Sequence, residues 1–360
     1  MSAPAPPVPR AVSRIRVVVA EDSATYRALL LEMLCRDPEL EVVGVVEDGD
    51  DAVALVRSLR PDVVLLDIHM PRLDGLEATK RIMSEVPTPV VVMSAWFVAN
   101  DVRASLRALE AGALTLLEKP PGPAVPGSAR AWKAFARTLR ALARVKVVRL
   151  ALGARVEPCP SRAAVGPTGV ERARPAIVAI GASTGGPMAL AEVLGGLPAT
   201  YPLPVLVVQH MSAGFVEGFV EWLSGMTPLR VTVASHREPI EAGRVYVAPV
   251  THHLGVSADG ARVQLIEDPP ERGIRPSASR LFASVAAAFG DRVQAVVLTG
   301  MGDDGVTGLR AVRFAGGRTV AQDETTSVIF GMPGSAIAAG VVDCVVPLQG
   351  IAAHLVEVAR

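Results

Sequence analysis

Short runs of apolar residues alternate with amphipathic stretches over the first 120 residues of the chain. The apolar runs are nearly continuous Val and Leu, without the alternation of polar and apolar positions that marks a half-exposed strand. Such runs are typical of parallel strands whose two faces are covered by helices. We expect strands over residues 16–20, 41–46, 62–66, 89–93 and 114–117, and helices over residues 24–34, 51–59, 76–85 and 101–111. Five strand–helix repeats predict a doubly wound α/β domain with a five-stranded parallel sheet.

A second pattern of the same kind begins at residue 176 and continues to residue 360. We expect strands over residues 176–180, 204–208, 245–248 and 293–298, and helices over residues 187–194, 215–224, 277–289 and 306–315. This pattern predicts a second doubly wound α/β domain with a mostly parallel sheet. Residues 176–360 are numerous enough to bury a hydrophobic core of their own.

Between the two patterns the composition changes. Residues 119–127 are rich in Pro and Gly, and residues 129–150 carry Arg and Lys at helical spacing between aromatic residues and Leu. We interpret the basic stretch as the last helix of the first domain. Its charged face is typical of a solvated or docking surface, with nucleic-acid binding as the alternative. We therefore expect a disordered tail over residues 1–13, a first domain over 14–150, a linker over 151–175 and a second domain over 176–360.

The composition narrows the class of protein. Half of the 360 residues are hydrophobic, and 36 basic residues balance 36 acidic ones. This excludes a largely disordered chain and a chain that coats nucleic acid by bulk charge. Cys35, Cys159 and Cys344 have no zinc-site or disulfide spacing, which predicts reduced thiols.

The N-terminus lacks a signal-peptide pattern and no run of 18 apolar residues occurs, so we expect a cytoplasmic protein without membrane insertion.

Polar residues stand at the expected strand ends of the first domain. Glu21 and Asp22 follow the first strand, and Asp67 follows the third. The carboxyl ends of strands form the ligand crevice of a doubly wound sheet, so we expect these acids to converge. Their oxygens suit Mg²⁺, and Ser94 and Lys119 reach the same edge from the fourth and fifth strands. The set is suited to accepting a phosphoryl group on an Asp, although each acid alone is also compatible with a helix cap.

This part of the chain resembles the response-regulator receiver domain. The resemblance covers about residues 14–120 and rests on VVVAEDSA (17–24), VVLLDIHMPRLDG (63–75), VVMSA (91–95) and LEKP (117–120). It implies that a histidine kinase phosphorylates Asp67. It also implies that Ser94 and Lys119 respond to the phosphoryl group as switch residues.

The same resemblance implies a bound Mg²⁺. Its ligands would be Asp22, Asp67 and the main-chain carbonyl of His69, with Glu21 contributing. Two positions depart from the usual receiver pattern. Glu21 replaces the more common Asp, and Leu116 stands where many receivers carry an aromatic switch residue.

The second domain opens with a serine on a glycine-rich turn. Residues 177–194 read IVAIGASTGGPMALAEVL, so an apolar strand leads through Gly-x-Ser-x-Gly into a helix. We expect Gly181 and Gly185 to permit a sharp turn that exposes the hydroxyl of Ser183. The spacing fits neither the dinucleotide-binding nor the phosphate-binding loop. A plain glycine turn is the alternative interpretation.

A serine nucleophile needs a base and an orienting acid. His210 follows the strand that ends at Gln209, and Asp303 and Asp304 follow the strand over residues 293–298. Parallel strands end at one edge of a sheet, so these side chains are expected near Ser183. Taken singly, the histidine is also compatible with a buried strand-end residue and the acids with turn caps. The order Ser–His–Asp differs from that of α/β-hydrolases, but a triad is defined by its geometry.

The second domain resembles the catalytic domain of CheB-type chemotaxis methylesterases. The matching stretches are AIGASTGGP (179–187), VVQHMSAGF (207–215), VYVAPVTHHL (245–254), VLTGMGDDG (297–305) and AQDETTSVIFGMP (321–333). By motif position, the resemblance implies Ser183 as nucleophile, His210 as base and Asp304 as acid. It further implies the backbone N–H groups of Thr184 and Met301 as oxyanion donors, and no cofactor for the hydrolase.

Two residues depart from the methylesterase pattern. Ser279 stands where the family commonly has Asp, and Ile274 where it commonly has His. The resemblance implies phosphorylation-activated hydrolysis of glutamate γ-methyl esters on the cytoplasmic domain of chemoreceptors, and in some members deamidation of receptor glutamines. The implied partners are a chemotaxis histidine kinase and the methylated receptor, with no nucleic acid. Two alternatives stay open: a receiver-controlled serine esterase or amidase for another substrate, and a non-catalytic binding module linked to a receiver.

Overall fold

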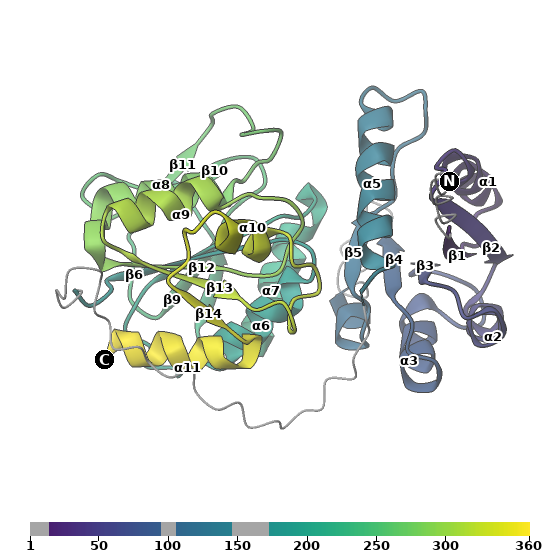
Figure 1. Cartoon of the computed structure of the whole chain (residues 1–360), viewed down its shortest axis with the longest axis horizontal. Coiled ribbons are helices and arrows are strands. Elements are labelled where there is room, and N and C mark those ends of the chain that lie inside the picture. Colours follow the sequence, from purple (N-terminus) through teal and green to yellow (C-terminus); the bar gives the residue numbers. More distant parts are fainter. Residues whose placement is uncertain (1–13, 95–105, 146–172) are drawn as a thin grey trace, which may run out of the picture. The chain divides into compact units, whose positions relative to one another are not determined.

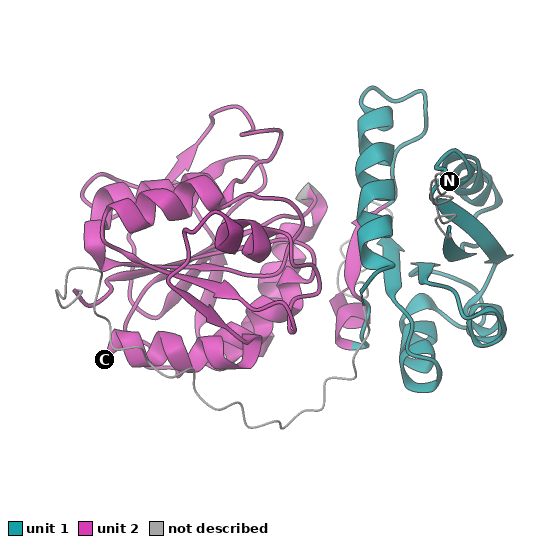
Figure 2. Cartoon of the chain, in the orientation of Figure 1, with its two compact units in different colours: residues 1–94, 111–113, 119–148 teal, residues 95–110, 114–118, 149–360 magenta. Residues whose placement is uncertain are grey.

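The computed structural model of the chain describes residues 14–94, 106–145 and 173–360. These residues fall into two compact units, shown in different colours in Figure 2. Of the described residues, the first unit comprises 14–94, 111–113 and 119–145, and the second comprises 106–110, 114–118 and 173–360. The chain contains two parallel sheets with helices packed on them (Figure 1), which confirms the predicted fold class.

The first sheet has five strands in the order β2-β1-β3-β4-β5. The strands are β1 (Ile15–Ala20), β2 (Leu40–Val46), β3 (Val63–Asp67), β4 (Val90–Ser94) and β5 (Thr115–Glu118). Strand β1 pairs in parallel with β2 and β3, and β3 pairs in parallel with β4. All residues of β3 and β4 are buried, whereas β2 at the edge is largely half-exposed. Continuous Val and Leu in the central strands therefore fill a sheet that is covered on both faces.

Helices that accompany this sheet in the described part of the chain include α1 (Ala24–Cys35), α2 (Gly49–Leu59), α3 (Gly75–Glu85) and α5 (Ser128–Leu142). Helix α5 is shorter than the stretch of residues 129–150 predicted from the basic periodicity. Its apolar face buries Trp132, Phe135, Leu139 and Leu142, and the helix ends where this face ends. On the polar side, Arg140 forms an ion pair with Asp37 at 2.5 Å.

Some expectations fall outside the described residues. They are the tail over residues 1–13, the first part of the helix predicted over 101–111, most of the linker over 151–175, and Cys159. Residues 106–110 of that predicted helix are helical. Cys35 is a free thiol.

The second sheet has seven strands in the order β14-β13-β12-β6-β7-β9-β8, and every neighbouring pair is parallel. The strands are β6 (Ile177–Ala182), β7 (Val205–Gln209), β8 (Arg230–Val233), β9 (Arg244–Val247), β12 (Val293–Val297), β13 (Arg318–Gln322) and β14 (Cys344–Val346). The pattern predicted β6, β7, β9 and β12. It missed the edge strands β8 and β14, the internal strand β13, and the antiparallel hairpin of β10 (His253–Val256) and β11 (Val263–Ile266).

Helices cover both faces of the second sheet (Figure 1). They are α6 (Gly186–Gly195), α7 (Val216–Met226), α8 (Ala278–Phe289), α9 (Val306–Phe314), α10 (Met332–Ala338) and α11 (Leu348–Ala359). The main core lies between α8 and the sheet, where Leu281, Phe282 and Val285 pack among Ala179 and Ala295. Helix α8 is consequently held tightly against the strands that carry the candidate site. Among the described residues, no helix is both long and apolar enough to cross a membrane.

Candidate functional sites at the two sheet edges

Three neighbouring strands of the second sheet end at one edge. Strand β6 lies between β7 and β12, and all three run in the same direction. Ser183 follows β6, His210 follows β7, and Asp304 lies in the loop after β12. Main-chain hydrogen bonds continue the pairing beyond the strands: Ser183 donates its N–H to Thr299 at 3.0 Å, and His210 donates to Ala182 at 3.0 Å. The parallel pairing therefore brings together the three residues that sequence analysis selected.

The turn that carries Ser183 is short. The carbonyl of Ser183 accepts the Gly186 N–H at 2.8 Å, and α6 begins at Gly186. Gly185 has φ +77°, a conformation that L side chains rarely adopt, so the expectation of a special backbone there is met. Gly181 has a different role from the one expected. It lies within β6, and a Cβ at this position would stand 2.7 Å from the Cβ of Ala278, so its small size allows α8 to pack closely.

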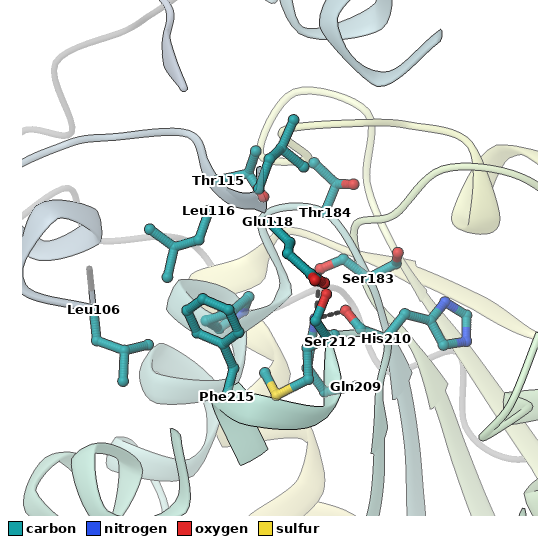
Figure 3. A pocket seen from close by; sticks show the side chains of 13 residues that line it. Leu106, Thr115, Leu116, Glu118, Ser183, Thr184, Gln209, His210, Ser212 and Phe215 are labelled. Atoms are coloured by element: carbon teal, nitrogen blue, oxygen red, sulfur yellow. Dashed lines mark hydrogen bonds between the residues drawn. The ribbon is translucent and has the colours of Figure 1, made fainter. Parts of the chain in front are cut away.

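His210 contacts Asp304 directly. Its Nε2 atom lies 3.0 Å from Oδ2 of Asp304, and the two side chains are 16% and 8% exposed. Figure 3 shows His210 beside Ser183, Thr184 and Gln209 at this edge of the sheet. Within the described residues, no hydrogen bond joins the Ser183 hydroxyl to the imidazole. Since Nε2 is occupied by the carboxylate, Nδ1 is the ring nitrogen that is available for a proton from serine.

Asp304 is surrounded by donors at the start of α8. Its oxygens accept hydrogen bonds from the Ser277 hydroxyl at 2.9 Å and from the N–H groups of Ala278 at 2.7 Å and Ser279 at 3.0 Å. Burial alone would raise the pKa of Asp304, but the contact with His210 and these N–H groups lower it well below its usual range. Asp304 is therefore a buried carboxylate that stays ionised at neutral pH.

The neighbouring acid has another environment. Asp303 is exposed and its carboxylate pairs with the guanidinium of Arg272 at 2.6 Å. Of the two acids between which the sequence alone could not decide, only Asp304 contacts His210 among the described residues.

Sequence reasoning missed the group that holds the helix N-terminus. His253 is fully buried, and its Nδ1 atom accepts the N–H of Ser277 at 3.1 Å. Its Nε2 atom lies 3.2 Å from the carbonyl of Pro269, so this nitrogen carries the proton and donates. The Ser279 hydroxyl accepts the N–H of Gly305 at 2.8 Å. These contacts join residues between 16 and 26 positions apart, and the sequence does not show which residues they connect.

The expected oxyanion donors lie on the loops beside the serine. Thr184 follows Ser183, and Met301 lies on the loop after β12. That loop is held in place because the Gly300 N–H donates to Ile329 at 3.0 Å and the Gly300 carbonyl accepts the Met332 N–H at 2.8 Å. In the described part of the chain, the N–H groups of Thr184 and Met301 donate to no intrachain acceptor, so both are available to an anion.

A second cluster lies at the strand ends of the first sheet. Oxygen atoms of Glu21, Asp22 and Asp67 lie within 4.8 Å of one another. Lys119 reaches into the cluster, with its Nζ atom 2.8 Å from Glu21 and 2.9 Å from Asp67. Ser94 ends β4 and accepts the Lys119 N–H on its carbonyl at 3.1 Å. His69 lies two residues beyond Asp67, in the segment that follows β3.

The electrostatics of this cluster fit a bound divalent cation. Burial, with the charge of Asp67, raises the pKa of Glu21, and burial raises the pKa of Asp67 despite the nearby Lys119. Burial alone would lower the pKa of Lys119, but the two carboxylates raise it. Three carboxylates against one ammonium leave two negative charges uncompensated, and oxygen ligands of this kind suit Mg²⁺.

The folds and the two sheet-edge sites define a class of protein: a response regulator whose receiver is joined to an α/β effector domain. The family model for the response regulator receiver domain matches residues 17–125, and that for the CheB methylesterase matches residues 178–355. The chain belongs to the CheB methylesterase family.

Relatives match over nearly their whole length. A Myxococcus xanthus protein named protein-glutamate methylesterase/protein-glutamine glutaminase 4 is 49% identical, covering 96% of this chain and 97% of its own. An Anaeromyxobacter dehalogenans protein, named protein-glutamate methylesterase/protein-glutamine glutaminase 3, is 48% identical over 95% of this chain and 98% of its own. The crystal structure of the Thermotoga maritima CheB methylesterase catalytic domain is 38% identical, with a TM-score of 0.50, and covers 51% of this chain and 99% of that one.

The depressed pKa of Asp304 predicts a pH-dependent contribution to stability. A carboxylate whose pKa is lowered by folding stabilises the protein above the pKa of the unfolded chain, about 3.9, and loses this contribution as the pH falls below it. We expect Asp304→Asn to lower the free energy of unfolding by about 1–3 kcal/mol at pH 7. The deficit should shrink as the pH is lowered from 5 towards 2, in urea titrations of the full chain.

Asp303→Asn is the matched control, because it removes the exposed carboxylate next in the chain. Its effect should stay within about 0.5 kcal/mol at every pH. A deficit for Asp304→Asn that is the same at pH 7 and pH 3 contradicts the ionised, hydrogen-bonded state of this carboxylate.

Proposed function

We propose that this protein hydrolyses γ-methyl esters of glutamate residues in chemoreceptors, and that phosphorylation of Asp67 activates this hydrolysis. The observation that carries the proposal is the contact between His210 and Asp304 beside the turn of Ser183. The names of the Myxococcus and Anaeromyxobacter relatives supply the substrate class, and also suggest deamidation of glutamine as a second activity.

The chemistry uses residues of the second domain alone. Oγ of Ser183 attacks the ester carbonyl carbon while its proton passes to Nδ1 of His210, once the serine side chain has rotated towards the ring. Catalytic hydrogen bonds often tighten in this way only when substrate is bound. The negative charge on the carbonyl oxygen is stabilised by the N–H groups of Thr184 and Met301, at about 3 kcal/mol per donor. The imidazolium then protonates the leaving methoxide, and methanol departs.

Water completes the reaction. His210 takes a proton from water, and the resulting hydroxide attacks the acyl-serine. The C–O bond to Ser183 then breaks while the imidazolium returns the proton to Oγ, which gives a free serine and a glutamic acid side chain that ionises to carboxylate by losing its proton to solvent. In the deamidase reaction the same steps release ammonia in place of methanol. Asp304 remains ionised throughout, holds the proton of His210 on Nε2 and stabilises the imidazolium.

The receiver would be phosphorylated by a histidine kinase. A carboxylate oxygen of Asp67 forms the new P–O bond as the P–N bond to the kinase histidine breaks. Asp22, Asp67 and the carbonyl of His69, with Glu21, would hold Mg²⁺, which supplies positive charge to the phosphoryl oxygens. Lys119 adds a further positive charge at the same place, and Ser94 would respond to the phosphoryl group as a switch residue. With such partners, a cytoplasmic location is part of the proposal.

The nucleophile assignment predicts the effect of one substitution. Ser183→Ala removes the attacking oxygen and should lower the rate of methanol release from methylated receptor membranes by at least about 10³-fold. The alanine variant should retain the unfolding transition of the parent protein, because the serine side chain makes no hydrogen bond among the described residues. Full activity in the variant would overturn the assignment.

The ring contacts predict the tautomer of the base. Because Nε2 of His210 faces a carboxylate, the neutral imidazole should carry its proton on Nε2. Nitrogen-15 NMR of the full chain labelled at histidine reports which nitrogen is protonated, and His210→Gln identifies the resonance by its loss. A proton on Nδ1 at neutral pH would show that this nitrogen cannot act as the base.

The receiver site predicts the control of activity. A small-molecule phosphodonor with Mg²⁺ should increase the initial rate of methanol release by the full chain, and chelation of Mg²⁺ should remove the increase. Asp67→Asn should abolish the response while leaving the basal rate measurable. Asp62→Asn, at the opposite end of the first sheet, is the control and should respond as the parent does. An undiminished response in Asp67→Asn would show that activation proceeds through another group.

A further inference from the structure

Gln209 connects the two loops that carry the proposed nucleophile and base. It is the last residue of β7, directly before His210, and its side chain is 3% exposed. Its amide nitrogen donates to the main-chain carbonyl of Ser183 at 2.8 Å and to that of His210 at 2.9 Å. Figure 3 shows both hydrogen bonds. A single buried amide thus contacts both residues without taking part in their side-chain chemistry.

The orientation of this amide is determined by its surroundings. Two carbonyl oxygens face one end, and only the NH₂ group can donate to both. The other end, Oε1, has no hydrogen-bond partner among the described residues. It lies against Gly186, where an added Cβ would stand 2.0 Å from it. The Gly186 N–H is already donated to Ser183, and Pro187 has no N–H to offer.

This arrangement has an energetic cost. A buried acceptor without a donor destabilises a fold by about 1–3 kcal/mol. An apolar side chain of similar volume would avoid that cost. The cost therefore points to a role for the NH₂ end of Gln209 other than stability.

The position of the two carbonyls suggests that role. Pairing between β6 and β7 runs to Ala182 and Gln209, and the His210 N–H still donates to Ala182. Beyond this point the chain turns into α6 on one side and into the loop after His210 on the other. The amide of Gln209 spans the two segments where the strand pairing stops.

We propose that Gln209 is a positioning residue, which fixes the distance between Ser183 and His210 by binding both of their main-chain carbonyls. The proposal rests on the proposed Ser183–His210 chemistry. A displacement of reacting groups by about 1 Å can lower a rate by about 10²-fold. The amide therefore matters for the rate of reaction even though it contacts no substrate.

The chain offers a matched control. Gln294 on β12 is also fully buried with an unpartnered Oε1 among the described residues, and its Nε2 donates only to the adjacent Ala295 carbonyl, at 3.3 Å. It pairs with Val178 and Arg318 near the start of the strand, away from the edge that carries Ser183. Gln294→Met and Gln209→Met thus make the same chemical change at two buried positions.

We expect Gln209→Met to lower kcat for methanol release from methylated receptor membranes by about 10–100-fold, with KM changed less than about threefold. Its melting temperature should stay close to that of the parent, because removal of the unpartnered oxygen offsets the loss of the donor to the Ser183 and His210 carbonyls. Gln294→Met should keep kcat within about twofold of the parent. Both variants are full-length chains, assayed with a phosphodonor and Mg²⁺.

A second variant tests the donor directly. In Gln209→Glu the side chain regains one donor only when protonated, and burial raises the pKa of such a group. The ratio of kcat for Gln209→Glu to kcat for Gln209→Met should therefore rise as the pH is lowered from 8 to 6. The ratio removes the pH dependence that the two variants share.

The outcomes separate this proposal from the proposed function. If Ser183→Ala is inactive while Gln209→Met keeps the parental kcat, only the positioning role is wrong. Equal losses of kcat in Gln209→Met and Gln294→Met, or a loss that follows a lowered melting temperature, likewise overturn it. If Ser183→Ala remains active, the proposed function itself fails.

Discussion

The parallel pairing of β6 with β7 on one side and β12 on the other is the constraint on which the second domain depends. Parallel strands all end at the same edge, so residues that follow them are gathered there whatever their separation in the sequence. Ser183, His210 and Asp304 are brought together by this geometry rather than by local chain structure. The first domain uses the same constraint for Glu21, Asp67 and Lys119.

The two sheet edges surround their buried carboxylates with opposite environments. At Asp304 the protein supplies neutral donors from the start of α8 and one imidazole, and the carboxylate stays ionised without a cation. At Asp67 the acids are gathered with too little positive charge, so their charged forms are destabilised. The first arrangement is complete in itself and suits a fixed orienting acid. The second is left open to a cation and suits a site that changes state.

Much of this architecture could be predicted from the sequence. The central strands were recognisable because both of their faces are buried, which leaves continuous Val and Leu. The edge strands β8 and β14 were missed because partial exposure and short length dilute that signal. Strand β13 is internal and largely buried, but Arg, Thr and Gln interrupt its apolar run. Helix α5 was predicted too long because its Arg and Lys spacing continues past the last buried residue, Leu142.

The candidate site, like the fold, was predicted from the sequence only in part. Ser183, His210 and Asp304 stand in recognisable motifs at strand ends. The choice between Asp303 and Asp304 needed a resemblance, since both acids occupy one loop and only tertiary contacts distinguish them. His253 and Gln209 gave no usable signal. Their roles depend on hydrogen bonds to main-chain atoms of residues far away in the chain. Almost every residue carries the same main-chain groups, so the sequence does not show where such a hydrogen bond forms.

The two adjacent acids also differ in how freely each can vary. Asp304 is enclosed by fixed donors, so a change there disturbs α8 and His210 together. Asp303 faces solvent beside the exposed Arg272, on the rim of the same edge. The charge presented to an approaching polypeptide can therefore be adjusted at position 303 while the internal geometry is left as it is, although the exposed and the buried acid are adjacent in the chain.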